Sequence, residues 1–100
     1  MDEQQVLKLV LGTISQEADD LGYDELRTAS ADTPLYGGGS GVDSLSLVRL
    51  VAAIERAAAR QFGRSVILAD EKAMSMRNSP FRTVGTLAQL LRERLGSVHA

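Results

Sequence analysis

Residues 37–51 read GGGSGVDSLSLVRLV, in which a glycine-rich run leads into a serine and then into regularly spaced apolar residues. After Ser44 the apolar positions recur as they do on one face of a helix. These positions are Leu47, Leu50, Val51, Ile54 and Ala58. The spacing predicts an amphipathic helix that starts near Ser44, has Asp43 as its N-cap and ends before Gly63.

Two further apolar stripes predict a helix on each side of this one. The N-terminal stripe consists of Leu7, Val10, Leu11 and Ile14, and the C-terminal stripe of Val84, Leu87, Leu90, Leu91 and Leu95. Thr83 is a suitable N-cap for the C-terminal helix, and Gly96 is a suitable stop. Asp70 is placed to cap a short helix through Met76, before Pro80 interrupts it. We therefore expect an all-α bundle.

Two segments connect the predicted helices. The apolar run SVIL at residues 65–68 resembles a strand, but no partner strand is evident elsewhere, so we do not expect a sheet. The connection from about Glu17 to Val42 is long for a compact domain, so we expect a turn or two of local structure within it. The apolar residues expected to pack that structure are Leu21, Tyr23, Leu26, Leu35 and Tyr36.

Composition limits the classes of function. A length of 100 residues with 44% hydrophobic residues fits a single domain, residues 1–100, with one modest core. The net charge of −2 has the wrong sign for electrostatically driven nucleic-acid binding. The chain has no cysteine, which excludes disulfides and thiolate metal sites. The N-terminal stretch lacks a basic flank and is broken by Lys8, so we expect neither a signal peptide nor a membrane span, and we expect a cytoplasmic location.

Ser44 does not fit the motifs of catalytic or phosphate-cradling serines. A Walker-type loop needs a lysine directly before its serine or threonine, but Asp43 occupies that position. A dinucleotide fingerprint needs a third glycine where Val42 stands, and a strand before it. A nucleophile elbow needs the pattern G-x-S-x-G, and a triad needs a base, whereas the only histidine is His99. On these grounds alone, the beginning of a helix is the simplest interpretation of the serine, and no metal-ligand cluster is evident.

Three segments taken in order indicate more than a helix start. They are GVDSL at 41–45, FGRSVILADEKA at 62–73 and TVGTLAQLL at 83–91. Together they resemble the acyl carrier protein family over most of the chain. The resemblance implies a four-helix bundle with a long first loop and a short third helix. It also implies that Ser44 carries 4′-phosphopantetheine through a phosphodiester, with Asp43 and Leu45 as its motif neighbours.

The resemblance also implies that other proteins modify the chain and act on its cargo. A phosphopantetheinyl transferase would install the arm from coenzyme A, and acyl groups would travel as thioesters on the thiol at its end. The chain would then need no catalytic residue of its own. It would deliver acyl intermediates to acyl-transferring or synthase enzymes, and we expect it to act as a monomer.

The chain departs from the family in the helix after Ser44. Family members usually have an acidic recognition helix there, whereas this chain has Arg49, Ala53, Arg56 and Arg60 on one helical face, called the basic stripe below. The stripe is either a solvated face or a surface for dedicated partners. The resemblance also implies a helix about one turn longer than in the family, because Phe62, which resembles the family's aromatic residue at the helix end, comes later in the chain. These departures favour a specialised lipid, polyketide-like or secondary-metabolite pathway over housekeeping fatty-acid biosynthesis.

Three alternatives remain open at the level of sequence. An aminoacyl or peptidyl carrier would differ in cargo, and its motif tends to place glycines directly before the serine, whereas Gly37 to Gly39 lie further upstream. A helical interaction module would keep the carrier fold without the modification. A small hydrolase would use Ser44 in the unmodified chain.

Overall fold

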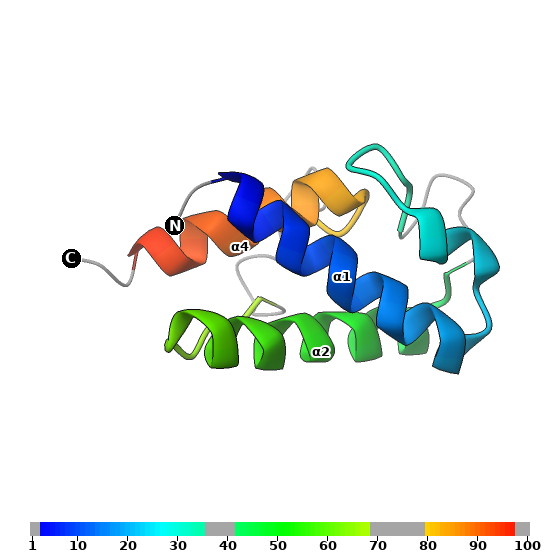
Figure 1. Ribbon diagram of the computed structural model, residues 1–100, viewed down its shortest axis with the longest axis horizontal. Helices are drawn as coiled ribbons and strands as arrows, with labels where there is room; N and C mark the ends of the chain where they lie inside the picture. Colours follow the sequence, from blue (N-terminus) through cyan, green and yellow to red (C-terminus); the bar gives the residue numbers. More distant parts are fainter. Residues whose placement is uncertain (1–2, 36–41, 69–79, 98–100) are drawn as a thin grey trace.

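The computed structural model describes residues 3–35, 42–68 and 80–97 (Figure 1). In order, its elements are α1 (Glu3–Leu21), the 3-10 helix η1 (Asp24–Thr28), α2 (Ser44–Phe62) and α4 (Val84–Ser97). Within those residues the only β-type pairing is an isolated bridge between Pro34 and Thr83. The all-α prediction is therefore confirmed for the described part of the chain. The glycine run 37–41, Tyr36 and the short helix predicted from Asp70 to Met76 lie outside the described residues.

Helix α1 is the element against which the others pack. It contacts η1, α2 and α4, whereas α2 and α4 bring no Cα atoms within 8 Å of each other in the described residues. Its buried positions are Val6, Leu9, Val10, Ile14 and Ala18. The predicted stripe was right for Val10 and Ile14, but Leu7 and Leu11 are only half-buried. The buried face is displaced toward Val6 and Leu9 because α1 is covered from two sides, by α2 and by α4.

The end of α1 lies further along the chain than the sequence suggested. The connection was expected from about Glu17, but the helix continues to Leu21 and stops at Gly22, whose φ is +81°. That left-handed conformation is the usual helix C-cap, and glycine adopts it without a Cβ clash. The N–H groups of Gly22 and Tyr23 both donate to the Ala18 carbonyl, at 2.9 and 3.1 Å. The expected local structure is the 3-10 helix that follows, in which Leu26 is fully buried.

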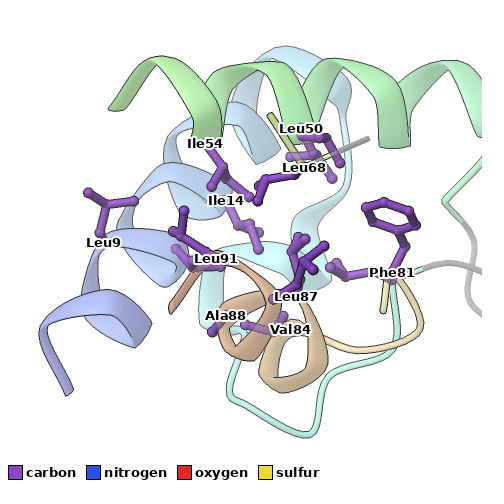
Figure 2. Packing of buried hydrophobic residues seen from close by; sticks show 14 of the residues in the cluster. Leu9, Ile14, Leu50, Ile54, Leu68, Phe81, Val84, Leu87, Ala88 and Leu91 are labelled. Carbon is purple, nitrogen blue, oxygen red and sulfur yellow. The ribbon is translucent and has the colours of Figure 1, made fainter. Parts of the chain in front are cut away.

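The apolar stripes predicted for α2 and α4 form the core. All five predicted residues of α2 and all five of α4 are buried. Figure 2 shows Leu50 and Ile54 of α2 and Leu87 and Leu91 of α4 directed toward the same interior as Ile14 of α1. Side chains rather than backbone contacts thus fill the space between α2 and α4.

Helix α2 is bounded as predicted. It starts at Ser44, ends at Phe62 and is followed by Gly63 in the left-handed conformation, with φ +69° and ψ 24°. The Gly63 N–H donates to the Ala59 carbonyl at 3.0 Å, which satisfies one of the orphan carbonyls at the helix end.

The segment after α2 has no regular secondary structure, and its backbone is held by side chains from both neighbouring helices. A Glu55 carboxylate oxygen accepts a hydrogen bond from the Leu68 N–H at 2.6 Å, and the Arg94 guanidinium donates to the Ile67 carbonyl at 3.1 Å. Arg64 donates to the Leu95 carbonyl at 3.4 Å. Residues 65–68 form no strand, as predicted, and Leu68 is fully buried.

The start of α4 is fixed by the chain segment before it and by residues 31–35. The Thr83 side chain accepts from the Thr86 N–H at 3.1 Å, which confirms Thr83 as the N-cap. The N–H groups of Val84 and Gly85 donate to the carbonyls of Thr33 and Ala31, at 3.0 and 2.7 Å. The orphan donors of the first turn are thereby satisfied by protein atoms. At the other end the prediction was wrong by a residue, because Gly96 lies inside the helix, which ends at Ser97.

Two helical glycines are expected to respond in opposite ways to alanine. A Cβ on Gly85 would lie 2.9 Å from the Ala31 carbonyl oxygen, which itself accepts the Gly85 N–H, so the two backbones must separate. A Cβ on Gly12 of α1 would meet nothing within 4 Å. We expect Gly85→Ala to destabilise the protein by about 1–3 kcal/mol and Gly12→Ala to stabilise it by about 0.5–1 kcal/mol. Urea unfolding measures both, and equal stabilisation by the two substitutions would contradict the close approach.

Candidate functional site

The candidate site is the start of α2. Asp43 precedes the helix with an extended backbone, φ −86° and ψ 173°, and Ser44 is the first helical residue. An Asp43 carboxylate oxygen accepts the Ser46 N–H at 2.7 Å, and the Asp43 carbonyl accepts the Leu47 N–H at 2.9 Å. Asp43 is therefore the N-cap, and the prediction that position 44 stands at a helix start is confirmed. The Ser44 side chain lies outside the described part of the structure, so the predicted outward direction of its hydroxyl stays a prediction.

Tyr23 connects this helix start to the end of α1. Its hydroxyl oxygen lies 3.4 Å from the Asp43 backbone nitrogen, which donates to it, and 3.3 Å from the Ser46 hydroxyl. Sequence reasoning placed Tyr23 only among the packing residues of the first connection. Only a general rule could have indicated a further role for Tyr23, namely that the hydroxyl of a half-buried tyrosine usually finds a hydrogen-bond partner. Which partner it finds depends on the fold and not on local sequence.

Asp43 is exposed and ionised at neutral pH. The bond from the Ser46 backbone N–H, followed by a bond from the Ser46 side chain, holds the pKa of the Asp43 carboxyl below its ordinary value of 3.8. Bonds of this kind favour the charged form because they are made to the carboxylate. A fixed negative charge therefore stands beside Ser44 on the N-terminal end of the helix dipole, where it is favourable.

Large apolar side chains point into solvent just after the serine. Leu45 is 84% exposed and Val48 is 63% exposed. These two residues are three apart and so lie on the same side of the helix. Leu47 and Leu50 of the same turns are buried. The first turns of α2 thus present apolar residues on their outer side as well as on their inner side, which is unusual for a helix whose outer side is merely solvated.

The basic stripe does not form a continuous exposed surface. Arg49 is paired with two carboxylates of α1, at 3.1 Å from Glu17 and 3.4 Å from Asp20. Ala53 is only 6% exposed, so its assignment as a partner-binding surface residue was wrong. Ala53 is buried because its edge of α2 faces α1. Arg49 and Ala57 both meet α1, and Ala53 lies one turn from each of them, so it is covered between them.

The other two members of the basic stripe are exposed. Arg56 and Arg60 have no ion-pair partner among the described residues. Arg56 lines a hollow that α2 shares with Ser65 and Val66, and Arg60 lines a groove between α1 and α2. The two arginines therefore line different hollows.

The described residues contain no group of three His, Cys, Asp or Glu side chains that could hold a metal ion. Among them, no helix combines the length and the apolar character needed to cross a bilayer. His99, the only histidine, lies outside the described residues.

Comparison of the chain with known protein families, curated proteins and solved structures gives no match. An all-helical arrangement hosts many unrelated functions. The function is therefore argued from the chemistry at the start of α2 and from the motif resemblance.

The Asp43 cap is expected to stabilise the protein in a pH-dependent way. Because the folded-state pKa is lowered, the stabilisation is fully present above the ordinary value of 3.8 and is lost as the pH falls through the lower folded-state value. Asp43→Ala should therefore lower the midpoint of thermal unfolding by several degrees at neutral pH, and this difference from the wild type should shrink below pH 3.8. Asp43→Asn, a cap that does not titrate, is the control, since its difference from Asp43→Ala should not change with pH. A wild-type advantage over alanine that is the same at low and neutral pH would contradict the cap's charged form.

Proposed function

We propose that the chain is a cytoplasmic acyl carrier protein whose Ser44 bears 4′-phosphopantetheine through a phosphodiester. Acyl intermediates would ride as thioesters on the thiol of that arm, and the chain would present them to partner enzymes. The observation that carries the proposal is the position of Ser44 as the first residue of a long amphipathic helix, inside the D-S-L motif and directly after its N-cap.

The local electrostatics are suitable for a phosphodiester. The N–H groups of the first helical residues have no intrahelical acceptor, and the Asp43 carboxylate already accepts from Ser46 and Leu45, so the Ser44 N–H is the donor beside the proposed anion. The helix dipole favours negative charge at this end by about 0.3–1 kcal/mol. That amount is too small to hold a ligand, so the covalent bond has to retain the arm. The helix start has only to tolerate a second negative charge next to Asp43.

The covalent bond retains the arm without help from the protein surface, but the enzyme that attaches the arm must recognise the chain. Leu45 and Val48 are exposed next to the serine and offer an apolar contact surface to the phosphopantetheinyl transferase and to synthase enzymes. Enzymes that receive the acyl cargo would use the same contact surface, because each of them must approach the end of α2 where the arm is attached. Helix α2 lacks the acidic face that is usual in the family, since Glu55 is its only acidic residue, and this departure supports dedicated partners of a specialised lipid, polyketide-like or secondary-metabolite pathway.

The proposal includes the finer architecture of the carrier fold. Residues 69–79 would contribute the short third helix from Asp70 to Met76 and complete a four-helix bundle. One observation supports this. Leu68 and Phe81, which flank the segment, are both buried in the core.

Modification of Ser44 is the decisive measurement. Incubation of the purified chain with coenzyme A, magnesium and a broad-specificity phosphopantetheinyl transferase should add the mass of one phosphopantetheine. Ser44→Ala should abolish the gain, because the phosphodiester forms on that hydroxyl. Ser46→Ala is the matched control, a serine of the same helical turn that should leave loading intact.

Each other outcome has a distinct meaning. No mass gain in the wild type would overturn the carrier proposal in favour of an unmodified interaction module. Ester hydrolysis by the unmodified chain, lost in Ser44→Ala, would favour a hydrolase instead. An aminoacyl rather than an acyl adduct on the protein isolated from its native cell would identify an aminoacyl or peptidyl carrier.

Leu45 is expected to serve recognition and not stability. Because it is 84% exposed, Leu45→Gln should leave the unfolding midpoint unchanged. It should lower kcat/KM of the transferase about tenfold, as expected when a leucine side chain loses part of its burial at an interface. Ile67→Gln is the control, since Ile67 is a similarly exposed residue, at 66%, on the segment after α2. Loading of Leu45→Gln at the wild-type rate would remove Leu45 from the recognition surface.

A further inference from the structure

A groove of about 800 Å³ runs between α1 and the last turns of α2. Helices α1 and α2 pack side by side and run in opposite directions (Figure 1). The groove therefore lies toward the end of α2 that is remote from Ser44. Helix α1 contributes Lys8, Gly12 and Gln16 to its lining, and α2 contributes Arg60 and Gln61.

The groove is positively charged, and its two cations are unpaired. No aspartate or glutamate belongs to its lining. Lys8 and Arg60 are exposed, and neither has an ion-pair partner among the described residues. Arg49 provides the contrast, because it lies on the same edge of α2, three turns earlier, and is paired with two carboxylates of α1. The α1–α2 seam is thus neutralised near Ser44 and left cationic at its other end.

The remaining lining residues indicate which anion suits the groove. Gln16 and Gln61 are exposed, and each side-chain amide both donates and accepts hydrogen bonds. Leu9, Gly12 and Ala57 add small or apolar surface. A ligand that satisfies all of these groups has carboxylates for the two cations, amides for the glutamines and small side chains. An extended acidic peptide has each of these features.

We propose that this groove binds an acidic peptide segment of a partner protein, with carboxylates on Lys8 and Arg60 and backbone amides on Gln16 and Gln61. A protein ligand is favoured over a nucleic acid because the chain carries a net charge of −2 and the groove has only two cations, so a polyanion would be repelled by the rest of the surface. The inference goes beyond the carrier proposal and is independent of it, since no groove residue is near Ser44 in the chain.

A short peptide of repeated Glu-Ala-Gly, with blocked ends, is the probe, and amide NMR shifts of the full chain are the readout. The expected shifts center on Lys8, Gly12, Gln16, Arg60 and Gln61. Lys8→Gln and Arg60→Gln should each weaken binding about two- to fivefold, as expected for one solvent-exposed ion pair, and added salt should weaken it further. Arg56→Gln is the matched control, because Arg56 is an exposed, unpaired arginine of the same helix outside the groove, and it should bind the peptide as the wild type does.

Two further arms separate the groove from general surface charge. Gly12→Phe places a large side chain in the groove lining without changing the charge, since a Cβ at Gly12 would meet no atom within 4 Å, and it should weaken binding about tenfold or more. The Gln-Ala-Gly peptide should not bind. The proposal is overturned if Gly12→Phe binds normally, if Arg56→Gln loses as much affinity as Arg60→Gln, or if the Gln-Ala-Gly peptide binds equally well. It is also overturned if inorganic phosphate or a short single-stranded oligonucleotide shifts the same amides more strongly than the acidic peptide does.

Discussion

Burial of one face of α1 is the interaction on which the other helices depend. Helices α2 and α4 both pack on α1 but do not approach each other's backbone within the described residues. Val10 and Ile14 of α1 are both fully buried. They therefore belong to the face of α1 that joins the core residues of α2 to those of α4. The same helix positions the candidate site, because Tyr23 follows directly after its C-cap and reaches the start of α2. A change in how α1 packs would thus be transmitted to Ser44 without any contact with the serine itself.

Helix α2 has an unusual distribution of apolar residues, and the distribution is consistent with the proposed carrier role. Its inner face is held by the core, which fixes the direction of the helix, while Asp43 fixes the residue at which the helix begins. Its outer face exposes Leu45 and Val48 close to that beginning. A carrier needs this combination, since a partner must find an apolar contact at a constant distance and orientation from the attachment point. In the proposed carrier, the core and Asp43 would hold the start of the helix in place, and the arm would supply the reach.

The helices could be predicted from sequence because periodic apolar residues report burial directly. Every predicted core position of α2 and α4 is buried, and the caps Asp43 and Thr83 are where local sequence placed them. What the sequence did not predict depends on pairs of residues far apart in the chain. Arg49 meets Glu17 and Asp20 across more than twenty-five positions, which neutralises one charge of the basic stripe. Ala53 was misassigned for the same reason, since helical spacing alone does not tell on which side a neighbouring helix will lie.

Charged residues are distributed unevenly along the α1–α2 pair. Carboxylates are concentrated where α1 ends and α2 begins, with Glu17, Asp20 and Asp43 as examples, whereas the opposite end of the α1–α2 pair carries Lys8, Arg60 and Arg64. A small net charge therefore conceals an electric dipole roughly parallel to α2. In the field of a charged partner such a dipole experiences a torque, so the molecule is turned before contact and not after it. Its productive encounters should consequently become rarer as ionic strength rises, even where the final complex is held by apolar surface.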